Sequence, residues 1–300
     1  MAHKAGFVSI IGKPNVGKST LMNVLVGERL SIITPKAQTT RHRILGIVNE
    51  EDYQIVFSDT PGIIKPKYSL QESMMSFVNG SLTDADVLLF VTDINEQHDE
   101  EDVLEKLLNR DIPTIVLINK IDKALQEQVD EKIAYWQEKL NPVAIYAISA
   151  LHKHNVDGLL DQVLSMLPEH PPYYDKEEYT DRSERFFVSE IIREKIFLNY
   201  QKEIPYSTEV IVKSFKEEEL RSGKPGDLMI RITAEIVVER DSQKNILIGT
   251  AGKMLKKVGT EARLEIEKFL GNKVFLEMFV KVIPDWRSKK NYLKSFGYDN

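Results

Sequence analysis

The sequence predicts two domains: a doubly wound α/β domain with a mostly parallel sheet, followed by a smaller α+β domain. The chain has 300 residues, a length at which one hydrophobic core usually gives way to two. Apolar runs alternate with helix-length amphipathic segments up to about Leu167, and this order changes after a proline-rich stretch beginning at Pro168. We therefore expect a first domain at 1–168, a linker at 169–183 and a second domain at 184–300.

Six strand-like runs and several helix-length segments make up the first domain. Some of the runs are apolar throughout, as expected of strands buried on both faces of a parallel sheet. Such sheets bind ligands at the carboxyl ends of their strands, so polar residues directly after a run are candidate site residues. The expected strands are 7–11, 44–48, 53–58, 87–92, 114–119 and 143–148, and the expected helices include 70–80, 100–109, 126–140 and 156–167.

A glycine-rich loop follows the first strand. It reads Gly12-Lys13-Pro14-Asn15-Val16-Gly17-Lys18-Ser19 and matches the pattern G-x-x-x-x-G-K-[ST], with apolar residues at helical spacing after it. In a strand–loop–helix context the glycines let backbone N–H groups face phosphate oxygens, and the helix N-terminus adds positive charge. We expect Lys18 to reach the β- and γ-phosphates and Ser19 to bind Mg²⁺.

Two further motifs each follow a strand. In Asp59-Thr60-Pro61-Gly62, the carboxylate can hold Mg²⁺ through a water and the Gly62 N–H can face the γ-phosphate. In Asn119-Lys120-Ile121-Asp122, the Asp122 carboxylate can accept both N1–H and the exocyclic amine of guanine, whereas adenine would leave it unpaired. We expect Asn119 to bond to N7 of the base and Lys120 to pack along it.

The fourth motif is Ser149-Ala150-Leu151, whose central N–H can reach the guanine O6. Four such motifs in this order identify the chain as a member of the TRAFAC GTPases. In these GTPases a threonine between the first two motifs ligates Mg²⁺, and comparison with relatives reading Thr-Arg favours Thr40 over Thr39 in Gln38-Thr39-Thr40-Arg41. The resemblance makes Lys18, Thr40 and Gly62 the catalytic groups and Ser19, Thr40 and Asp59 the Mg²⁺ ligands. The expected GTP- and GDP-binding residues are Gly12, Asn15, Val16, Gly17, Lys18, Ser19, Thr20, Asp59, Gly62, Asn119, Lys120, Asp122, Ser149, Ala150 and Leu151.

One catalytic part is missing from the expected reaction, in which water attacks the γ-phosphorus of GTP. Ras-type enzymes carry a glutamine after the second motif to orient the water, and this chain has Ile63 there. The sequence shows no obvious arginine finger either, so we expect slow intrinsic turnover. In relatives whose loop carries Asn15, this side chain helps to bind K⁺ beside the phosphates.

The second domain has the predicted order α-β-β-α-α-β, with strands at 208–215, 229–238 and 273–283. A G-x-x-G turn joins its last two helices, and this order resembles a type II KH domain, whose turn clamps about four nucleotides of single-stranded RNA. The turn here lacks the usual lysine-bearing pair, so lysines behind it are expected to contribute phosphate contacts. A core-facing stripe is expected on the last helix at Leu255, Val258, Ala262, Ile266 and Phe269, and the expected RNA-binding residues are Gly249, Thr250, Ala251, Gly252, Lys253, Lys256 and Lys257.

Charge is uneven along the chain. Residues 241–300 contain 12 Lys and Arg against 7 Asp and Glu, a net charge of +5, so the preceding 240 residues carry −11 of the total of −6. A basic end suggests that a polyanionic partner meets the C-terminal part. With no cysteine, no apolar run near the ~20 residues of a membrane span and no signal-like N-terminus, we expect a soluble protein of the reducing cytoplasm.

Taken together, one set of GTPase motifs followed by a KH-like domain resembles the bacterial Era family. The expected fold is thus a P-loop GTPase doubly wound α/β sheet followed by an α+β type II KH domain. The resemblance implies binding to the 3′ end of the small-subunit ribosomal RNA, assistance in assembly of the 30S subunit, and peripheral association with the inner face of the cell membrane. A monomer is expected. Two alternatives remain at this point: an ATPase, and an RNA-binding scaffold that holds GTP with negligible hydrolysis.

Overall fold

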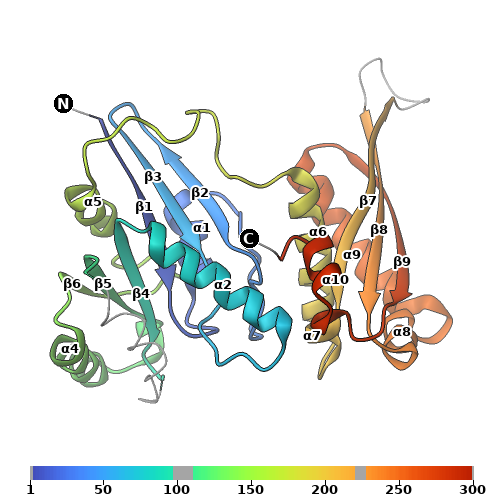
Figure 1. Cartoon of the computed structure of the whole chain (residues 1–300), viewed down its shortest axis with the longest axis horizontal. Coiled ribbons are helices and arrows are strands. Elements are labelled where there is room, and N and C mark those ends of the chain that lie inside the picture. The colour runs from blue at the N-terminus through green and yellow to red at the C-terminus, as the bar shows by residue number, and fades with distance from the viewer. Residues whose placement is uncertain (1–2, 97–110, 220–227, 299–300) are drawn as a thin grey trace. The chain divides into compact units, whose positions relative to one another are not determined.

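The computed structural model describes residues 3–96, 111–219 and 228–298 (Figure 1). It divides into two compact units, the first ending at Asp181 and the second beginning at Arg182. The helix expected at 100–109 lies outside the described residues.

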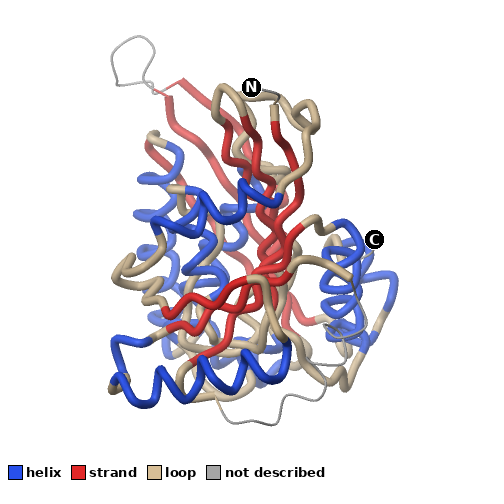
Figure 2. Tube along the Cα trace, turned by 90° about the vertical axis from the view of Figure 1, so that its left-hand side faces the viewer, coloured by secondary structure: helices blue, strands red, loops and turns tan. Residues whose placement is uncertain are grey.

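The first unit is built on a six-stranded sheet with the order β2-β3-β1-β4-β5-β6, whose strands are labelled in Figure 1. Figure 2 shows the strands in red and the helices in blue. All neighbouring strands are parallel except β2 and β3, which pair antiparallel because only Glu50–Asp52 connect them. The predicted doubly wound, mostly parallel fold is therefore confirmed. The strands are β1 (Lys4–Ile11), β2 (Ile44–Asn49), β3 (Tyr53–Asp59), β4 (Val87–Asp93), β5 (Thr114–Asn119) and β6 (Ala144–Ala147); the helices are α1 (Lys18–Val26), α2 (Ser69–Asp84), α4 (Gln126–Leu140) and α5 (Asp157–Met166), with the 3₁₀ turn η1 (Ile121–Lys123).

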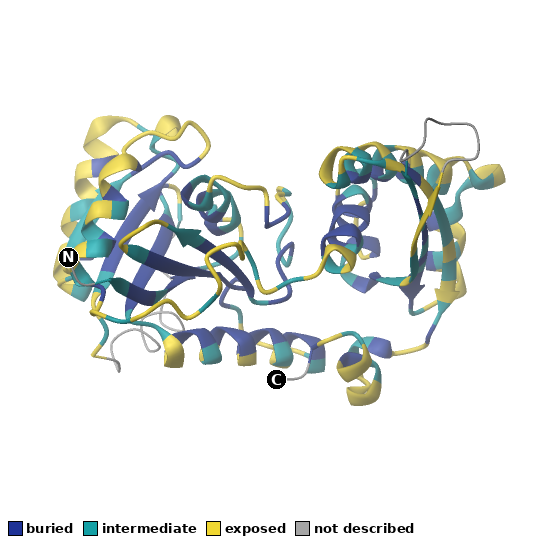
Figure 3. Cartoon of the chain, turned by 90° about the horizontal axis from the view of Figure 1, so that it is seen from above, coloured by how far each residue is buried: buried dark blue, intermediate teal, exposed yellow. Residues whose placement is uncertain are grey.

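Helices cover both faces of this sheet, as alternating β and α units require. On one face, Leu21 of α1 and Leu159 of α5 join the main apolar cluster with inward residues of β1, β3, β4 and β5. On the other face, the Ser9 hydroxyl of β1 donates to the Ser81 carbonyl of α2 at 2.7 Å. Phe90 of β4 there meets Trp136 of α4, with ring centroids 4.9 Å apart. The strands are accordingly the most deeply buried part of the unit (Figure 3).

Most of the residues expected as a linker, 169–183, pack with the first unit. We call residues 169–181 the strap. Its backbone runs beside β2, where Ile47 N donates to Tyr179 O at 2.9 Å and Gly46 forms an antiparallel bridge with Thr180. Gln54 of β3 binds it further along, accepting from Tyr173 N at 2.7 Å and Tyr174 N at 3.0 Å. Long-range pairing of this kind leaves no local pattern in a proline-rich, charged sequence.

The second unit has a three-stranded sheet of order β7-β8-β9, with β7 and β8 antiparallel and β8 and β9 parallel. Helices α6 and α9 pack on one face, where Val188, Ile192, Val258 and Ile266 share an apolar cluster with the sheet. The order predicted for a type II KH domain is confirmed. The elements are α6 (Glu184–Asn199), α7 (Ile204–Ser207), β7 (Glu209–Glu219), β8 (Leu228–Val238), α8 (Asp241–Ile248), η2 (Thr250–Gly252), α9 (Lys253–Leu270), β9 (Lys273–Val282), η3 (Trp286–Ser288) and α10 (Lys290–Ser295).

One member of the stripe expected on α9 does not face the core as predicted. Val258, Ala262 and Ile266 are fully buried and Leu255 packs against the same apolar cluster, whereas Phe269 is 41% exposed. Phe269 lies in the last turn of the helix, where its ring packs against Phe187 of α6 with the centroids 5.5 Å apart. The helical repeat therefore predicts burial for a residue that the last turn of the helix leaves partly exposed.

Candidate nucleotide and RNA sites

The glycine loop connects β1 to α1, and its backbone requires glycine at two places. Gly12 and Gly17 have φ values of 148° and 102°. A Cβ atom would lie 2.1 Å from the Val91 carbonyl oxygen at position 12, and 2.2 Å from Asn119 Nδ2 at position 17. Both glycines therefore allow a close approach that no side chain permits. The loop opens onto the N-terminus of α1 at Lys18, where free N–H groups favour an anion.

Lys18 is buried and folded back onto the loop. Its ammonium donates to the Gly12 carbonyl at 3.1 Å and to the Lys13 carbonyl at 2.8 Å. Burial lowers the pKa of Lys18 to about 8, although the charges of Asp59 and Glu96 oppose this shift. A phosphate group entering the loop would give this ammonium the negative partner that its surroundings supply only in part.

The low pKa of Lys18 predicts that nucleotide affinity falls as pH rises. Between pH 7 and pH 8.5 the charged fraction of a lysine with a pKa of about 8 falls from roughly nine-tenths to a quarter, so Kd for GDP should rise about fourfold. Titration with fluorescent GDP at constant ionic strength measures this. A Lys18→Arg variant is the control, because its guanidinium stays charged and any titration of guanine itself affects both proteins. Equal pH dependence in the two proteins would contradict the prediction.

Three oxygen-bearing side chains meet beside Lys18. The Ser19 hydroxyl donates to Asp59 Oδ2 at 2.7 Å and lies 2.8 Å from the Thr40 hydroxyl. The second carboxylate oxygen, Asp59 Oδ1, is buried without a hydrogen-bond partner among the described residues. Burial raises the pKa of Asp59, and the nearby Lys18 ammonium opposes this. Hard oxygen donors with one of them unsatisfied fit a Mg²⁺ ion.

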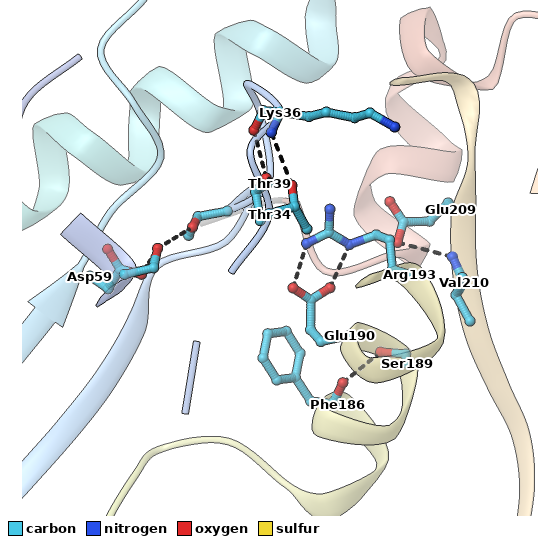
Figure 4. Close-up of polar contacts among 12 residues, drawn as sticks. Thr34, Lys36, Thr39, Asp59, Phe186, Ser189, Glu190, Arg193, Glu209 and Val210 are labelled. Atoms are coloured by element: carbon cyan, nitrogen blue, oxygen red, sulfur yellow. Dashed lines mark hydrogen bonds and ion pairs between the residues drawn. The ribbon is translucent and has the colours of Figure 1, made fainter. Parts of the chain in front are cut away.

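The adjacent threonines have different partners. Thr39 lies 2.5 Å from the Thr34 hydroxyl and donates to the Lys36 carbonyl at 2.7 Å, within its own loop (Figure 4). Thr40 instead faces Ser19. These contacts give a geometric reason to favour Thr40 over Thr39 as the Mg²⁺ ligand, a choice that the sequence supported only through resemblance.

The loop after β3 is anchored on the glycine loop. Ile63 N donates to the Gly12 carbonyl at 3.0 Å, and a Cβ atom at Gly62 would lie 2.6 Å from Pro14 N. Thr60 fixes the same loop by donating to the Ile10 carbonyl at 2.8 Å. Ile63 itself is only 3% exposed, so its side chain is part of the packing.

The loops that follow β5 and β6 are joined by Asn119. Its amide nitrogen donates to the Val16 carbonyl at 2.8 Å, and its amide oxygen accepts from Ala150 N at 3.0 Å. Asp122 accepts from the Ser149 hydroxyl at 2.6 Å, and this bond holds the pKa of the Asp122 carboxyl below its usual range. Asp122 is therefore an anion at neutral pH, held in place by the fourth motif.

Two acidic residues at the end of β4 were missed by the sequence reasoning. Lys120 has a positive φ of 66°, and its ammonium binds Asp93 Oδ2 at 2.5 Å and the Asn15 carbonyl at 2.6 Å. Glu96 lies 3.4 Å from the Lys13 ammonium and accepts from Thr92 at 2.9 Å. The available signal was their position directly after an apolar strand, as in the other motifs.

Asp93 is expected to hold the Lys120 side chain in place. Replacing Asp93 by asparagine keeps the size of the side chain but removes the charge, and the pair is partly exposed, so the expected loss is about 1 kcal/mol. GDP and GTP should both dissociate roughly fivefold faster. Stopped-flow displacement of fluorescent nucleotide measures this, with Asp84→Asn as the control because Asp84 pairs with Arg43 at the surface. Unchanged rates in the Asp93 variant would contradict the role.

A cavity of about 400 Å³ lies over these loops, within the size range of small-molecule sites. The phosphate-side motifs and the base-side loops both open onto it, so one elongated ligand can contact both. Asp59, Asn119 and Ala150 lie buried beneath. The predicted residues that line the cavity are Asn15, Gly17, Lys18, Ser19, Thr20, Thr40, Gly62, Lys120 and Leu151.

In the second unit, the G-x-x-G turn has the backbone of a sharp, exposed loop. Gly249, Ala251 and Gly252 have φ values of 69°, 51° and 74°. A Cβ atom at Gly252 would meet nothing within 4 Å, so open space lies before it. Next to the turn is a groove of about 380 Å³, lined by Gly252, Leu255, Lys256, Gly259, Thr260, Arg263, Leu276 and Met278. Lys253 and Lys257 are exposed on the same helix.

Comparison with known proteins covers both units. The 50S ribosome-binding GTPase family matches residues 7–120, and the KH domain family matches residues 203–287. GTPase Era of Staphylococcus haemolyticus (strain JCSC1435) is 45% identical over 298 residues, which is 99% of this chain and 97% of that protein. GTPase Era of Alkaliphilus metalliredigens (strain QYMF) is 44% identical over the full length of both.

The chain belongs to the Era family of GTPases. It is accordingly a GTP hydrolase, and the alternatives of an ATPase and of a non-hydrolysing scaffold fall away. A structure of Era in complex with MgGDPNP and nucleotides 1506–1542 of 16S ribosomal RNA has a TM-score of 0.93 and 41% identity, covering 99% of this chain and 100% of that one. A variant of Era from Aquifex aeolicus bound to GDP and AlF₄⁻ has the same score, identity and coverage.

Proposed function

We propose that the 400 Å³ cavity binds GTP with Mg²⁺ and that the second unit binds the 3′ end of small-subunit ribosomal RNA, so that the protein assists 30S assembly. The observation that carries the nucleotide site is the meeting of Ser19, Thr40 and Asp59 beside the buried Lys18 ammonium. Ser19 and Thr40 would bind the metal directly, and Asp59 through a water. When bound, Mg²⁺ supplies positive charge to the β- and γ-phosphate oxygens.

The residues of the chain contribute mainly by binding and by neutralising charge. Lys18 and the N–H groups of the glycine loop hold the phosphates, and Gly62 N–H is placed to face the γ-phosphate. Ile63 has no group that could orient the attacking water, and no arginine is found among the described residues that line the cavity. We therefore expect slow hydrolysis of GTP. Single-turnover rates measured with and without RNA will show whether RNA accelerates the reaction.

Binding of ribosomal RNA is supported by the groove beside the G-x-x-G turn and by the RNA complex of a relative. Gly252→Asp places a negative side chain where a phosphate would approach, and should weaken binding of an RNA with the 16S 3′-end sequence at least tenfold. Fluorescence anisotropy measures the RNA affinity. Binding of fluorescent GDP should stay unchanged in the same variant. Equal RNA affinity of the variant and the parent protein would overturn the assignment.

We also infer that K⁺ binds near Asn15 and accelerates hydrolysis. The Asn15 amide nitrogen donates to the Pro35 carbonyl at 3.2 Å, so the amide oxygen is the group that could contact a cation beside the phosphates. Hydrolysis should be faster in KCl than in NaCl at equal ionic strength, and Asn15→Ala should remove the difference. Equal rates of the parent protein in both salts would rule out the K⁺ site.

We further propose that the protein acts as a monomer in the cytoplasm and contacts the inner face of the cell membrane only peripherally. A cysteine-free sequence suits a reducing compartment. Among the described residues, no helix combines the length and the apolar character that crossing a membrane requires. Flotation with liposomes in each nucleotide state would measure any peripheral binding.

A further inference from the structure

Two exposed phenylalanines lie on the open face of the β7-β8-β9 sheet. Phe275 and Phe279 of β9 are 41% and 58% exposed. The residues that alternate with them, Val274, Leu276 and Met278, instead belong to or pack against the apolar cluster beneath α6 and α9. Large aromatic side chains are usually buried, so two on the outer face of one strand indicate a surface that binds something.

Basic side chains surround these rings. Arg231 of β8 is in register with Phe275, and its guanidinium lies 4.5 Å from the centre of that ring. Glu235, in register with Phe279, lies between Lys213 at 3.7 Å and Lys281 at 3.6 Å. The strand registers place Lys216, Arg231, Lys273 and Lys281 on this face with Glu218, Glu235 and Glu277, and the contact with Glu235 adds Lys213, which lies at a bulge. Arg231 also pairs with Glu218 at 3.4 Å. Positive side chains still outnumber negative ones.

The groove beside the G-x-x-G turn and the aromatic face lie on opposite sides of the same strand, β9. Leu276 and Met278, which line that groove, lie on the same strand as the two phenylalanines but point to its opposite side. Because β9 is an edge strand, a chain leaving the groove can pass around it onto the open face. Phe275 and Phe279 are four residues apart, about 13 Å along a strand, so each ring can receive a different base.

We propose that Phe275, Phe279 and Arg231 form a stacking surface for single-stranded RNA that continues beyond the G-x-x-G groove. The inference rests on the RNA-binding function proposed above. Exposed aromatic rings stack on bases with little sequence preference, and the flanking lysines and Arg231 attract the phosphates. The surplus of positive charge fits an anionic partner, and the exposed rings favour RNA over an acidic protein surface because bases stack on aromatic rings. The groove holds about four nucleotides, so this second contact requires a longer RNA.

The test compares two RNA lengths on the full chain. A fluorescent four-nucleotide RNA and a twelve-nucleotide RNA, both with 16S 3′-end sequence, are titrated by anisotropy against the parent protein and Phe275→Ala/Phe279→Ala. The double variant should bind the twelve-nucleotide RNA at least tenfold more weakly and the four-nucleotide RNA equally well. Phe275→Tyr/Phe279→Tyr should bind both RNAs like the parent protein, because tyrosine keeps the ring. Ultraviolet crosslinking of the longer RNA should label peptides that contain these positions.

The outcomes separate this surface from the groove. Unchanged affinity of the alanine variant for the longer RNA would overturn the stacking surface and leave the groove intact. If the alanine variant kept its RNA affinity but no longer bound the 30S subunit, the face would bind a ribosomal protein, and the stacking surface would again be overturned. Failure of both RNAs to bind the parent protein would overturn the RNA-binding function and the stacking surface with it. Thermal denaturation and binding of fluorescent GDP show that the variants are folded.

Discussion

With Asp122 replaced by asparagine, affinity for GTP should fall about 30- to 1,000-fold, while xanthosine triphosphate should become a ligand. The Asp122 carboxylate is ionised at neutral pH, and the hydrogen bond from the Ser149 hydroxyl lowers its pKa further and orients it. It can accept two hydrogen bonds from guanine, and an amide would turn an N–H group toward one of these donors. The loss of a charge-assisted pair costs about 2–4 kcal/mol. Xanthine carries a carbonyl oxygen in place of the exocyclic amine, so the amide can donate to it.

Competition against fluorescent GDP measures both effects, with ATP, GTP and xanthosine triphosphate as competitors. Ser149→Ala is the matched control, because it removes the hydrogen bond that orients Asp122 but keeps the charge. This variant should weaken GTP binding modestly without changing which base is preferred. If the asparagine variant kept the preference of the parent protein for guanine, Asp122 would not be the residue that reads the base.

Thr40→Ala should lower the rate of GTP hydrolysis about 100-fold, while Thr39→Ala should lower it less than about fivefold. The two substitutions remove the same hydroxyl from neighbouring positions. Thr40 lies 2.8 Å from Ser19 in the oxygen cluster that we assign to Mg²⁺, whereas Thr39 is bonded to Lys36 and Thr34. The difference between the variants therefore reports the metal site rather than the loop as a whole.

Single-turnover hydrolysis at saturating Mg²⁺ measures these rates. Chelation of the metal should lower all three proteins to the same rate, below that of Thr40→Ala in Mg²⁺, because the positive charge on the phosphates is then lost in each of them. GDP affinity should differ little among the three proteins in the absence of Mg²⁺. Similar rates for the two variants in Mg²⁺ would show that Thr40 has no special part in the site.

The sequence could group the candidate site residues because their motifs occupy one kind of position. Asp59, Asn119 and Ser149 each follow an apolar run, and the carboxyl ends of parallel strands meet at one edge of a sheet. A local pattern was therefore enough to bring distant residues together. Asp93 follows a strand in the same way, but it matches no motif and its partner Lys120 is far away in sequence.

Contacts between distant segments were harder to predict. The strap has no periodicity, and its order comes from backbone bonds to β2 and from Gln54, which only the folded sheet brings together. Helix α7 is four residues long and contains Pro205 in its first turn, too short for a helical repeat to be seen. Strand β2 runs antiparallel to β3 because the connection between them is short. This direction can be inferred only when the two strands are known to pair with each other.

The strap covers one edge of the sheet in the first unit. Strand β2 is one of the two edge strands of the six-stranded sheet, and an uncovered edge strand offers free N–H and C=O groups to other chains. Residues 178–181 cover this edge. Ile47 N donates to the Tyr179 carbonyl, Leu45 N donates to Asp181 Oδ1, and Gly46 forms a bridge with Thr180. The Asn49 side chain donates to the Glu178 carbonyl. At the β2 edge, intermolecular β-pairing is thus hindered by a stretch of chain whose composition suggested only a linker.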